Sequence, residues 1–282
     1  MIRTLIHIPH SLLQDYIQYI AIREFDCYHQ DIFKPMHAKH EIHMMFMINC
    51  QMHDFINVAS NPKKVTLTKR STPDCTFSGL LTSMKGSIHF KGHIELLVIH
   101  FKPTGLYRLF NIPPSEITDC LGDVDALFSR DILHLHEQIL EAKSYKDMFR
   151  LTELYLLTRL QKVRIKGPAL EKAAGYMLNR PENYSIKELA YHSNMSLKTF
   201  ERRFIEQVGL CPKLFARIRR FNHAMDLKTY QPDLTWLDIC YQSEYYDPMH
   251  LVKDFKNFAG MSPTNLFKNA PPLYEDTSLY PV

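Results

Sequence analysis

The sequence predicts an α+β chain of more than one domain, with a β-rich N-terminal half followed by helices and an all-helical C-terminal half. Short apolar runs, several of them β-branched or aromatic, recur at intervals of about ten residues over 30–105, which is typical of antiparallel strands in a barrel or sandwich. From residue 105 on, the apolar residues follow helical spacing instead. With 282 residues, the chain has room for two domains that each bury a core.

The composition excludes several classes of protein. Apolar residues make up 45% of the chain and charged residues 23%, as in ordinary globular proteins, and no apolar run reaches the roughly 18 residues of a membrane span. The first residues lack the apolar core of a signal peptide, so we expect a cytoplasmic protein. The six cysteines lie far apart without a CxxC pair, which favours buried free thiols over disulfides or a zinc knuckle.

The predicted strands of the first half are apolar runs between turn residues. They cover Glu41–Cys50, Val65–Thr68, Phe77–Leu81, Ile88–Phe90 and Ile94–Phe101. Two helices follow. Leu133, Ile139 and Leu140 mark the first at helical spacing, and Phe149, Leu154, Leu157 and Leu160 mark the second. Ser144 is the start signal of the second of these helices. Because Lys-Gly-Pro at 166–168 breaks the helical pattern, we expect a domain over 1–165, a second over 166–268 and a flexible tail over 269–282.

The C-terminal half contains the pattern of a helix-turn-helix unit. Ser185 and Glu188 form a capping box that opens a short helix. Asn194 follows where that helix breaks, and Asn tolerates the left-handed conformation that a tight turn needs. Ser196 caps the next helix, whose apolar positions fall on one face: Leu197, Phe200, Phe204 and Val208. Two capped helices around a tight turn, the second with a polar outer face, are what helix-turn-helix DNA binding requires.

A second copy of this pattern follows 50 to 51 residues later. Leu237, Ile239, Leu251 and Phe255 take the places of Ile186, Leu189, Phe200 and Phe204. Between the copies, residues from Pro212 to about Lys228 are expected to form one amphipathic helix with Arg217, Arg219 and Arg220 exposed. Two copies at matching spacing are far more specific than one. Seven basic against two acidic residues over 196–220 also favour an anion-binding surface, with nucleic acid first and a solvated helix face as the alternative.

At these residues the chain resembles the AraC/XylS family of bacterial transcription regulators, over roughly 168–268. The likeness rests on Leu189-Ala190, Met195-Ser196, Phe200, Arg202 and Phe204, then Gly209, Pro212, Phe215, Arg220 and Ala224, and finally Asp247, His250, Phe255-Lys256, Gly260, Ser262-Pro263 and Phe267. The resemblance implies an all-α domain of seven helices, with two helix-turn-helix units joined by a linker helix. The Gly usual before the second recognition helix is Glu244 here, so we expect this turn to be opened or strained.

The N-terminal half is similar, more weakly, to an uncharacterised sensor-like domain found ahead of such DNA-binding domains. The stretch 98–106 carries the likeness, together with Phe110-Asn111-Ile112-Pro113 and Glu116-Ile117-Thr118-Asp119. By analogy we expect a cupin-like barrel followed by helices that mediate dimerisation. Residues 1–165 would then be a sensory or dimerisation domain, and 166–268 the DNA-binding domain.

We therefore expect a sequence-specific DNA-binding transcription regulator, controlled by a ligand or partner of the N-terminal domain, and not an enzyme. The expected DNA-binding residues are Ser196, Lys198, Thr199, Glu201 and Arg202 in the first unit and Pro248, Met249, His250 and Lys253 in the second. An ion pair of Arg202 with Glu206 is the alternative for that arginine. The second set has fewer hydrogen-bonding groups, so the first unit is expected to make the larger contribution to DNA recognition. Double-stranded promoter DNA is the expected partner; RNA polymerase, an unidentified small-molecule effector and a second copy of the chain are candidates, and no membrane partner is expected.

Two other functions remain open. Twelve of the fifteen histidines lie in the first 136 residues, so one alternative is a cupin-type metal-binding enzyme domain fused to a DNA-binding module. On one strand, however, His37 and His43 share a face while His40 points to the other, so these three cannot converge, and we expect no metal or other cofactor. The second alternative is a scaffold protein whose second unit no longer binds DNA. The sequence contains no nucleotide-binding or catalytic signature.

Overall fold

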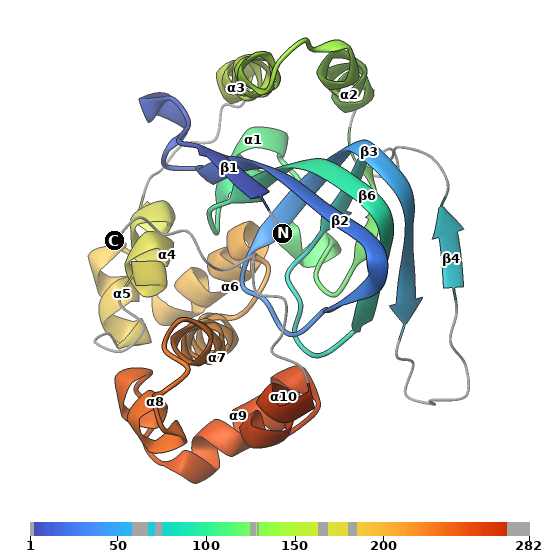
Figure 1. The fold of residues 1–282 in the computed structure, drawn as a ribbon. Helices are drawn as coiled ribbons and strands as arrows, with labels where there is room; N and C mark the ends of the chain where they lie inside the picture. The colour runs from blue at the N-terminus through green and yellow to red at the C-terminus, as the bar shows by residue number, and fades with distance from the viewer. Residues whose placement is uncertain are drawn as a thin grey trace.

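The N-terminal part of the chain is built on a seven-stranded antiparallel sheet. The computed structural model describes residues 3–57, 67–70, 75–124, 128, 130–162, 169–179 and 185–269. The strands are β1 (Arg3–His7), β2 (Ile17–Pro35), β3 (Ile42–Asn57), β4 (Leu67–Arg70), β5 (Cys75–Ser78), β6 (Gly86–Phe101) and β7 (Leu121–Asp123). Their order is β1-β2-β6-β3-β5-β7, with β4 paired to β3. Figure 1 shows that the long strands curve strongly across the sheet.

The strand predictions are confirmed in part. β6 joins two runs that were predicted as separate strands, because Gly92, at φ 81°, allows the strand to bend without ending. β2 was not predicted, although it has 19 residues. Seven of the nine residues from Ile17 to Phe25 are buried, so this strand lacks the alternation that marks a half-exposed strand.

The expected barrel is an open sheet over the described residues. Edge strands β1 and β7 have five and three residues, and each pairs with one neighbour only. Such short edges do not provide the continuous hydrogen-bonding rows that barrel closure needs. The prediction of a β-rich N-terminal half is confirmed, whereas the sheet does not close into the expected barrel over the described residues.

Helices cover the sheet on one side. α1 (Gly105–Phe110) lies close to the sheet, and α2 (Asp131–Glu141) and α3 (Tyr145–Lys162) lie above it in Figure 1. Of the short 3-10 turns, η1 (Ser11–Leu13) contacts α3, and η2 (Pro114–Glu116) contacts α6. The helices predicted for α2 and α3 are confirmed, and Ser144 Oγ accepts a hydrogen bond from the Asp147 backbone amide at 3.2 Å. His136 Nε2 donates to Met47 O at 2.9 Å and so ties α2 to β3.

The C-terminal part consists of seven helices among the described residues, as expected. They are α4 (Ala169–Asn179), α5 (Ile186–His192), α6 (Leu197–Val208), α7 (Pro212–Tyr230), α8 (Trp236–Gln242), α9 (Pro248–Ala259) and α10 (Pro263–Asn269). Aromatic side chains form their core, and Phe200, Phe204, Phe215, Phe221 and Phe255 are fully buried. The predicted boundary near residue 165 and the tail from 270 lie outside the described residues.

The two parts of the chain share one continuous apolar core, and hydrogen bonds join them. Asn222 Nδ2 on α7 donates to Ala38 O at 2.9 Å, and the Ala38 amide donates to Phe258 O at 3.0 Å. At the end of α6, Gly209 has φ 94°, and a Cβ atom there would lie 2.7 Å from Leu80 Cδ1. Both the left-handed backbone and the close approach of Leu80 favour glycine at this position.

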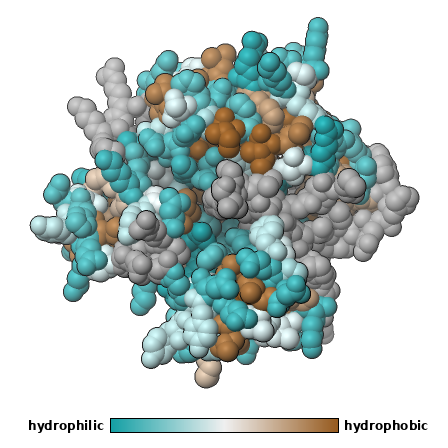
Figure 2. All heavy atoms as spheres, turned by 60° about the vertical axis from the view of Figure 1, so that its left-hand side comes forward, coloured by the Kyte–Doolittle hydropathy of each residue, from teal (hydrophilic) through white to brown (hydrophobic). Residues whose placement is uncertain are grey.

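The five cysteines that the structure describes are free thiols. Cys27, Cys75 and Cys240 are buried as predicted, whereas Cys120 and Cys211 are exposed because they lie in connecting segments. In the described part of the chain, no helix combines the length and apolar character of a membrane span. The face in Figure 2 carries hydrophobic residues in separate groups among hydrophilic ones.

Candidate nucleic-acid interface

The first helix-turn-helix unit is set by local capping. The Glu188 amide donates to Ser185 Oγ at 3.4 Å, and the Ser185 amide donates to Glu188 Oε2 at 3.1 Å. These two bonds form the predicted capping box and fix the start of α5. Leu189 and Ala190 then face the core. The sequence therefore determines this helix start through residues three apart.

The turn between α5 and α6 has the predicted left-handed residue. Asn194 has φ 53°, and the Met195 amide donates to Ala190 O at 3.0 Å, which closes the turn. Ser196 then caps α6, because its Oγ accepts from the Thr199 amide at 3.2 Å. The direction in which α6 leaves the turn is therefore fixed by backbone hydrogen bonds.

The helix α6 has one buried and one open face. Phe200, Phe204 and Val208 are fully buried as predicted. Leu197 was expected on the same face and is exposed instead, because it is the first residue of α6 and extends beyond the core at the turn. The polar outer face remains open, since Lys198, Glu201 and Arg202 are all exposed. A duplex could approach this side of α6.

Each predicted residue of the first unit can be placed on this face. Ser196 is exposed and Thr199 is half-buried, and the Ser196 hydroxyl donates to Thr199 Oγ1 at 2.9 Å. The alternative for Arg202, an ion pair with Glu206, is not formed among the described residues. Glu206 instead accepts a hydrogen bond from the Tyr107 hydroxyl on α1 at 3.0 Å. The Arg202 side chain is therefore available to an external partner.

The second unit repeats the first in detail. Thr235 and Asp238 form a capping box at the start of α8, and the Tyr245 amide donates to Cys240 O at 2.9 Å, as Met195 does to Ala190. These equivalent positions are 50 residues apart, whereas the two N-caps, Ser196 and Asp247, are 51 apart. One extra residue therefore lies in the second turn. It is Tyr246, whose side chain is exposed.

The second turn is strained rather than opened. Glu244 has φ 61°, in the left-handed region where a side chain is unfavourable. The carboxylate atom Oε2 of Glu244 is buried without a hydrogen-bond partner among the described residues. Tyr245, next in the chain, is buried, and the Arg220 guanidinium lies 5.4 Å from the centre of its ring. Burial of its neighbours thus holds this turn in place.

The outer face of α9 is open at three of its four predicted positions. Pro248, Met249 and Lys253 are exposed, and Met249 is 83% exposed. His250 is half-buried, with its ring edge-on to that of Tyr245 at 5.4 Å. Asp247 caps the helix by accepting from the His250 amide at 2.7 Å. This face accordingly offers fewer polar groups than that of α6.

The prediction that the linker arginines are exposed was wrong. Arg217 forms an ion pair with Asp254 at 2.5 Å, Arg219 Nε donates to Leu178 O at 3.0 Å, and Arg220 stacks on Tyr245. All three are half-buried. α7 lies between α4 on one side and α8 and α9 on the other, so its polar stripe meets neighbouring helices rather than solvent. Arg217 and Arg220 thus hold α7 to the second unit, and Arg219 holds it to α4.

The sequence analysis missed Asp254, which has no exposed surface. It lies on the buried face of α9 beside Phe255, where an apolar residue would be expected. Its carboxylate pairs with Arg217, and its Oδ2 lies 4.0 Å from His250 Nε2. Burial and then the Asp254 charge raise the pKa of the Tyr245 hydroxyl. The only signal in the sequence is a charged residue on an otherwise apolar helix face.

Two protein families match this chain. Residues 189–269 match a family described as "Helix-turn-helix domain", and residues 6–122 match a domain of unknown function, DUF6597. None of the curated protein sequences matches the chain. The first match begins within α5 and covers the first turn, α6, α7 and the whole of the second unit.

Solved structures of similar layout have low TM-scores. The structure of a variant of apo ToxT from Vibrio cholerae matches with a TM-score of 0.46 and 11% sequence identity. The match covers 88% of this chain and 97% of that one. ToxT with bound unsaturated fatty acid gives 0.44 at 10% identity, with 88% and 94% covered. The DNA-binding domain of AdpA in complex with a target DNA gives 0.34 at 24% identity, with 36% and 91% covered.

Proposed function

We propose that this protein is a DNA-binding transcription regulator of the AraC type and that it recognises promoter DNA mainly through the outer face of α6, because residues 189–269 match a helix-turn-helix family. The observation that supports this proposal is the open N-terminal part of α6, where Lys198, Glu201 and Arg202 are exposed beside a capped turn. In helix-turn-helix proteins the N-terminal residues of the second helix contact base edges in the major groove.

The side chains on α6 have distinct chemical roles in this proposal. Arg202 donates two hydrogen bonds to the O6 and N7 atoms of a guanine, and Glu201 accepts from the amino group of a cytosine. Lys198 reaches a guanine or a phosphate. Ser196 and Thr199 lie at the start of α6, where amide groups favour phosphate oxygens and so set the register of the helix on the duplex.

The second unit contributes less in this proposal. Pro248 and Met249 on α9 offer apolar contact only, and Lys253 is suited to phosphate. His250 is held between Tyr245 and Asp254, which limits its reach toward a base. α7 packs against α6 of the first unit, and Arg217 and Arg220 hold it to the second, so one chain could address two successive major grooves, about 34 Å apart.

We propose residues 1–165 as the regulatory domain and 166–268 as the DNA-binding domain. Support comes from contacts at both units: Tyr107 bonds to Glu206 at the end of α6, and the Ala38 amide bonds to Phe258 O on α9. A small-molecule effector, a second copy of the chain or RNA polymerase acting on the first domain would change how α6 and α9 are presented. The protein then acts in the cytoplasm, by binding and without catalysis.

Selection of bound fragments from a random duplex pool, followed by anisotropy titrations, tests the proposal. The Arg202→Ala variant should lose about 1–3 kcal/mol of binding free energy on the selected site and lose its preference at one base position. Arg203→Ala is the matched control, since Arg203 is an equally exposed neighbour outside the proposed contact set. For the wild type, log affinity should fall linearly with log salt. A pool that shows no enrichment, or an Arg202→Ala variant with unchanged base preference, would refute the assignment.

A further inference from the structure

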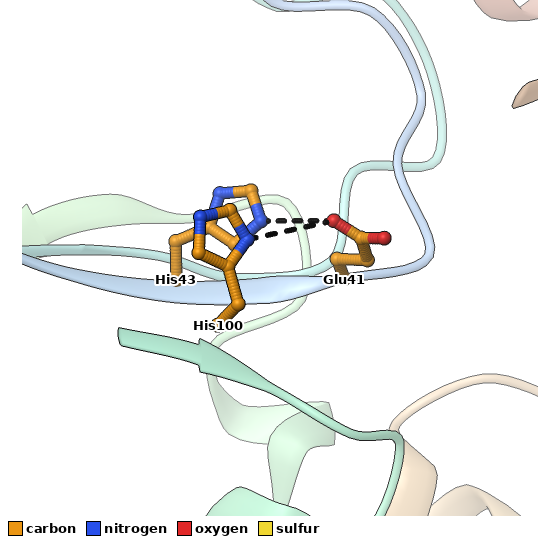
Figure 3. A group of neighbouring side chains, drawn as sticks. All are labelled: Glu41, His43 and His100. Atoms are coloured by element: carbon orange, nitrogen blue, oxygen red, sulfur yellow. Dashed lines mark hydrogen bonds and ion pairs between the residues drawn. The ribbon is translucent and has the colours of Figure 1, made fainter. Parts of the chain in front are cut away.

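A group of metal-ligating side chains lies in the N-terminal domain, away from the DNA-binding surface. Glu41, His43 and His100 lie together, and their ligand atoms are all within 4.8 Å of one another. Glu41 precedes β3, while β3 and β6 pair so that His43 is directly opposite His100. Figure 3 shows both imidazoles turned toward the Glu41 carboxylate. The sequence analysis considered only histidines of one segment, His37, His40 and His43. In the structure the second histidine of the group is His100, which lies on the neighbouring strand β6.

The buried imidazole of His100 approaches Glu41 without reaching hydrogen-bond distance. His100 is 1% exposed, and neither of its ring nitrogens has a hydrogen-bond partner among the described residues. The nearest carboxylate oxygen, Glu41 Oε2, lies 3.9 Å from His100 Nδ1 and 3.1 Å from His43 Nε2. A buried polar group without a hydrogen bond destabilises the fold, so a ligand that bonds to these nitrogens would offset that cost.

The protonation states suit a cation. Burial lowers the pKa of both histidines and outweighs the neighbouring Glu41, which raises it, so the imidazoles are neutral near pH 7. Burial raises the pKa of Glu41, but the two neighbouring imidazoles outweigh it and hold the pKa well below its usual value. The group therefore presents two neutral nitrogen atoms and one carboxylate. Metal ions bind histidine and glutamate in these states.

We propose that Glu41, His43 and His100 form a binding site for a divalent transition-metal ion, with Zn²⁺ as the best match. Two imidazole nitrogens and one carboxylate oxygen are a common zinc ligand set, which leaves a fourth position for water or another small ligand. In a tetrahedral site with bonds of about 2 Å, the ligand atoms lie about 3.3 Å apart. The present separations, from 3.1 Å to at most 4.8 Å, need shifts of about 1 Å or less per side chain.

The surroundings of this site support access and rigidity. The Glu41 side chain is 18% exposed, which gives an ion a route from solvent. The ring of Tyr19 stacks on that of His100 with centroids 4.1 Å apart, and so fixes the orientation of the imidazole. The preceding residue, His40, bonds to Asn222 of α7. The site therefore adjoins the contact between the N-terminal domain and the linker helix.

A zinc titration of the full chain against a competing chromophoric chelator tests this site. The stripped wild type should bind one Zn²⁺ per chain, and Co²⁺ in its place should give the visible absorption of a four-coordinate site. Glu41→Gln, which preserves shape, and His100→Ala should each weaken binding at least tenfold. His93→Ala is the matched control, because His93 lies on the same strand and pairs with Asp26 instead; it should leave zinc affinity unchanged.

Circular dichroism and thermal unfolding of each variant establish that it is folded before the titration is interpreted. If His100→Ala does not fold, the isosteric Glu41→Gln variant decides the question alone. Folded wild-type protein that binds no zinc at micromolar concentrations would overturn the proposal. So would zinc binding that Glu41→Gln leaves unchanged, because the ion would then be held elsewhere on the chain.

Discussion

Replacing Asn222 by alanine should weaken the contact between the N-terminal domain and the linker helix. Asn222 is 7% exposed, its Nδ2 donates to Ala38 O at 2.9 Å, and its Oδ1 accepts from His40 Nδ1 at 2.6 Å. The substitution leaves the carbonyl of Ala38 and Nδ1 of His40 buried without partners. At about 1–3 kcal/mol for each buried group, we expect a loss of about 2–6 kcal/mol in the free energy of unfolding.

Urea unfolding followed by two probes measures this loss. The single tryptophan, Trp236, packs against Phe255 and Phe267 and reports on the second helix-turn-helix unit, while circular dichroism reports on the whole chain. In the wild type we expect the two transitions to coincide, because one apolar core joins the domains. In Asn222→Ala they should separate. Asn265→Ala, an exposed asparagine on α10, is the control. The reasoning is wrong if Asn222→Ala unfolds within about 0.5 kcal/mol of this control.

Three further predictions follow from particular residues. Glu244→Gly should stabilise the protein by about 1 kcal/mol, since glycine relieves the left-handed backbone at φ 61°; an unchanged or lower midpoint of thermal unfolding would contradict this. Burial lowers the pKa of His37 to about 4, so the unfolded chain binds a proton that the folded chain does not as the pH falls from about 6.5 to 4. His37 should therefore contribute a drop of about 1.4 kcal/mol per pH unit to the free energy of unfolding in that range, in addition to the contributions of His40 and His223, and His37→Leu should reduce the total slope by that amount in urea titrations between about pH 4.5 and 6. Lys253→Ala should weaken binding to the selected DNA less than Arg202→Ala does, and anisotropy titrations giving the reverse order would show that the second unit dominates.

The features that the sequence predicted correctly depend on residues close together in the chain. Both N-caps of the first unit, the left-handed Asn194 and the 50-residue repeat all involve residues a few positions apart, or two copies of one such pattern. Helix caps and amphipathic faces have the same meaning in any surroundings, because their geometry follows from the helix itself. The open outer face of α6, with Arg202 exposed, follows the same periodicity.

The features that sequence analysis missed depend on partners far away in the chain. Arg217 and Arg219 have the spacing of exposed residues, and only the placement of α4 and α9 against α7 supplies Leu178 O and Asp254 as partners. The pairing of β3 with β6, not the spacing within either strand, brings His43 next to His100. A helix or strand period states which side of an element a residue occupies, but not which element covers that side. By itself the sequence determined the two helix-turn-helix units, and the tertiary structure decided which polar side chains remain available, because burial is a property of the neighbours.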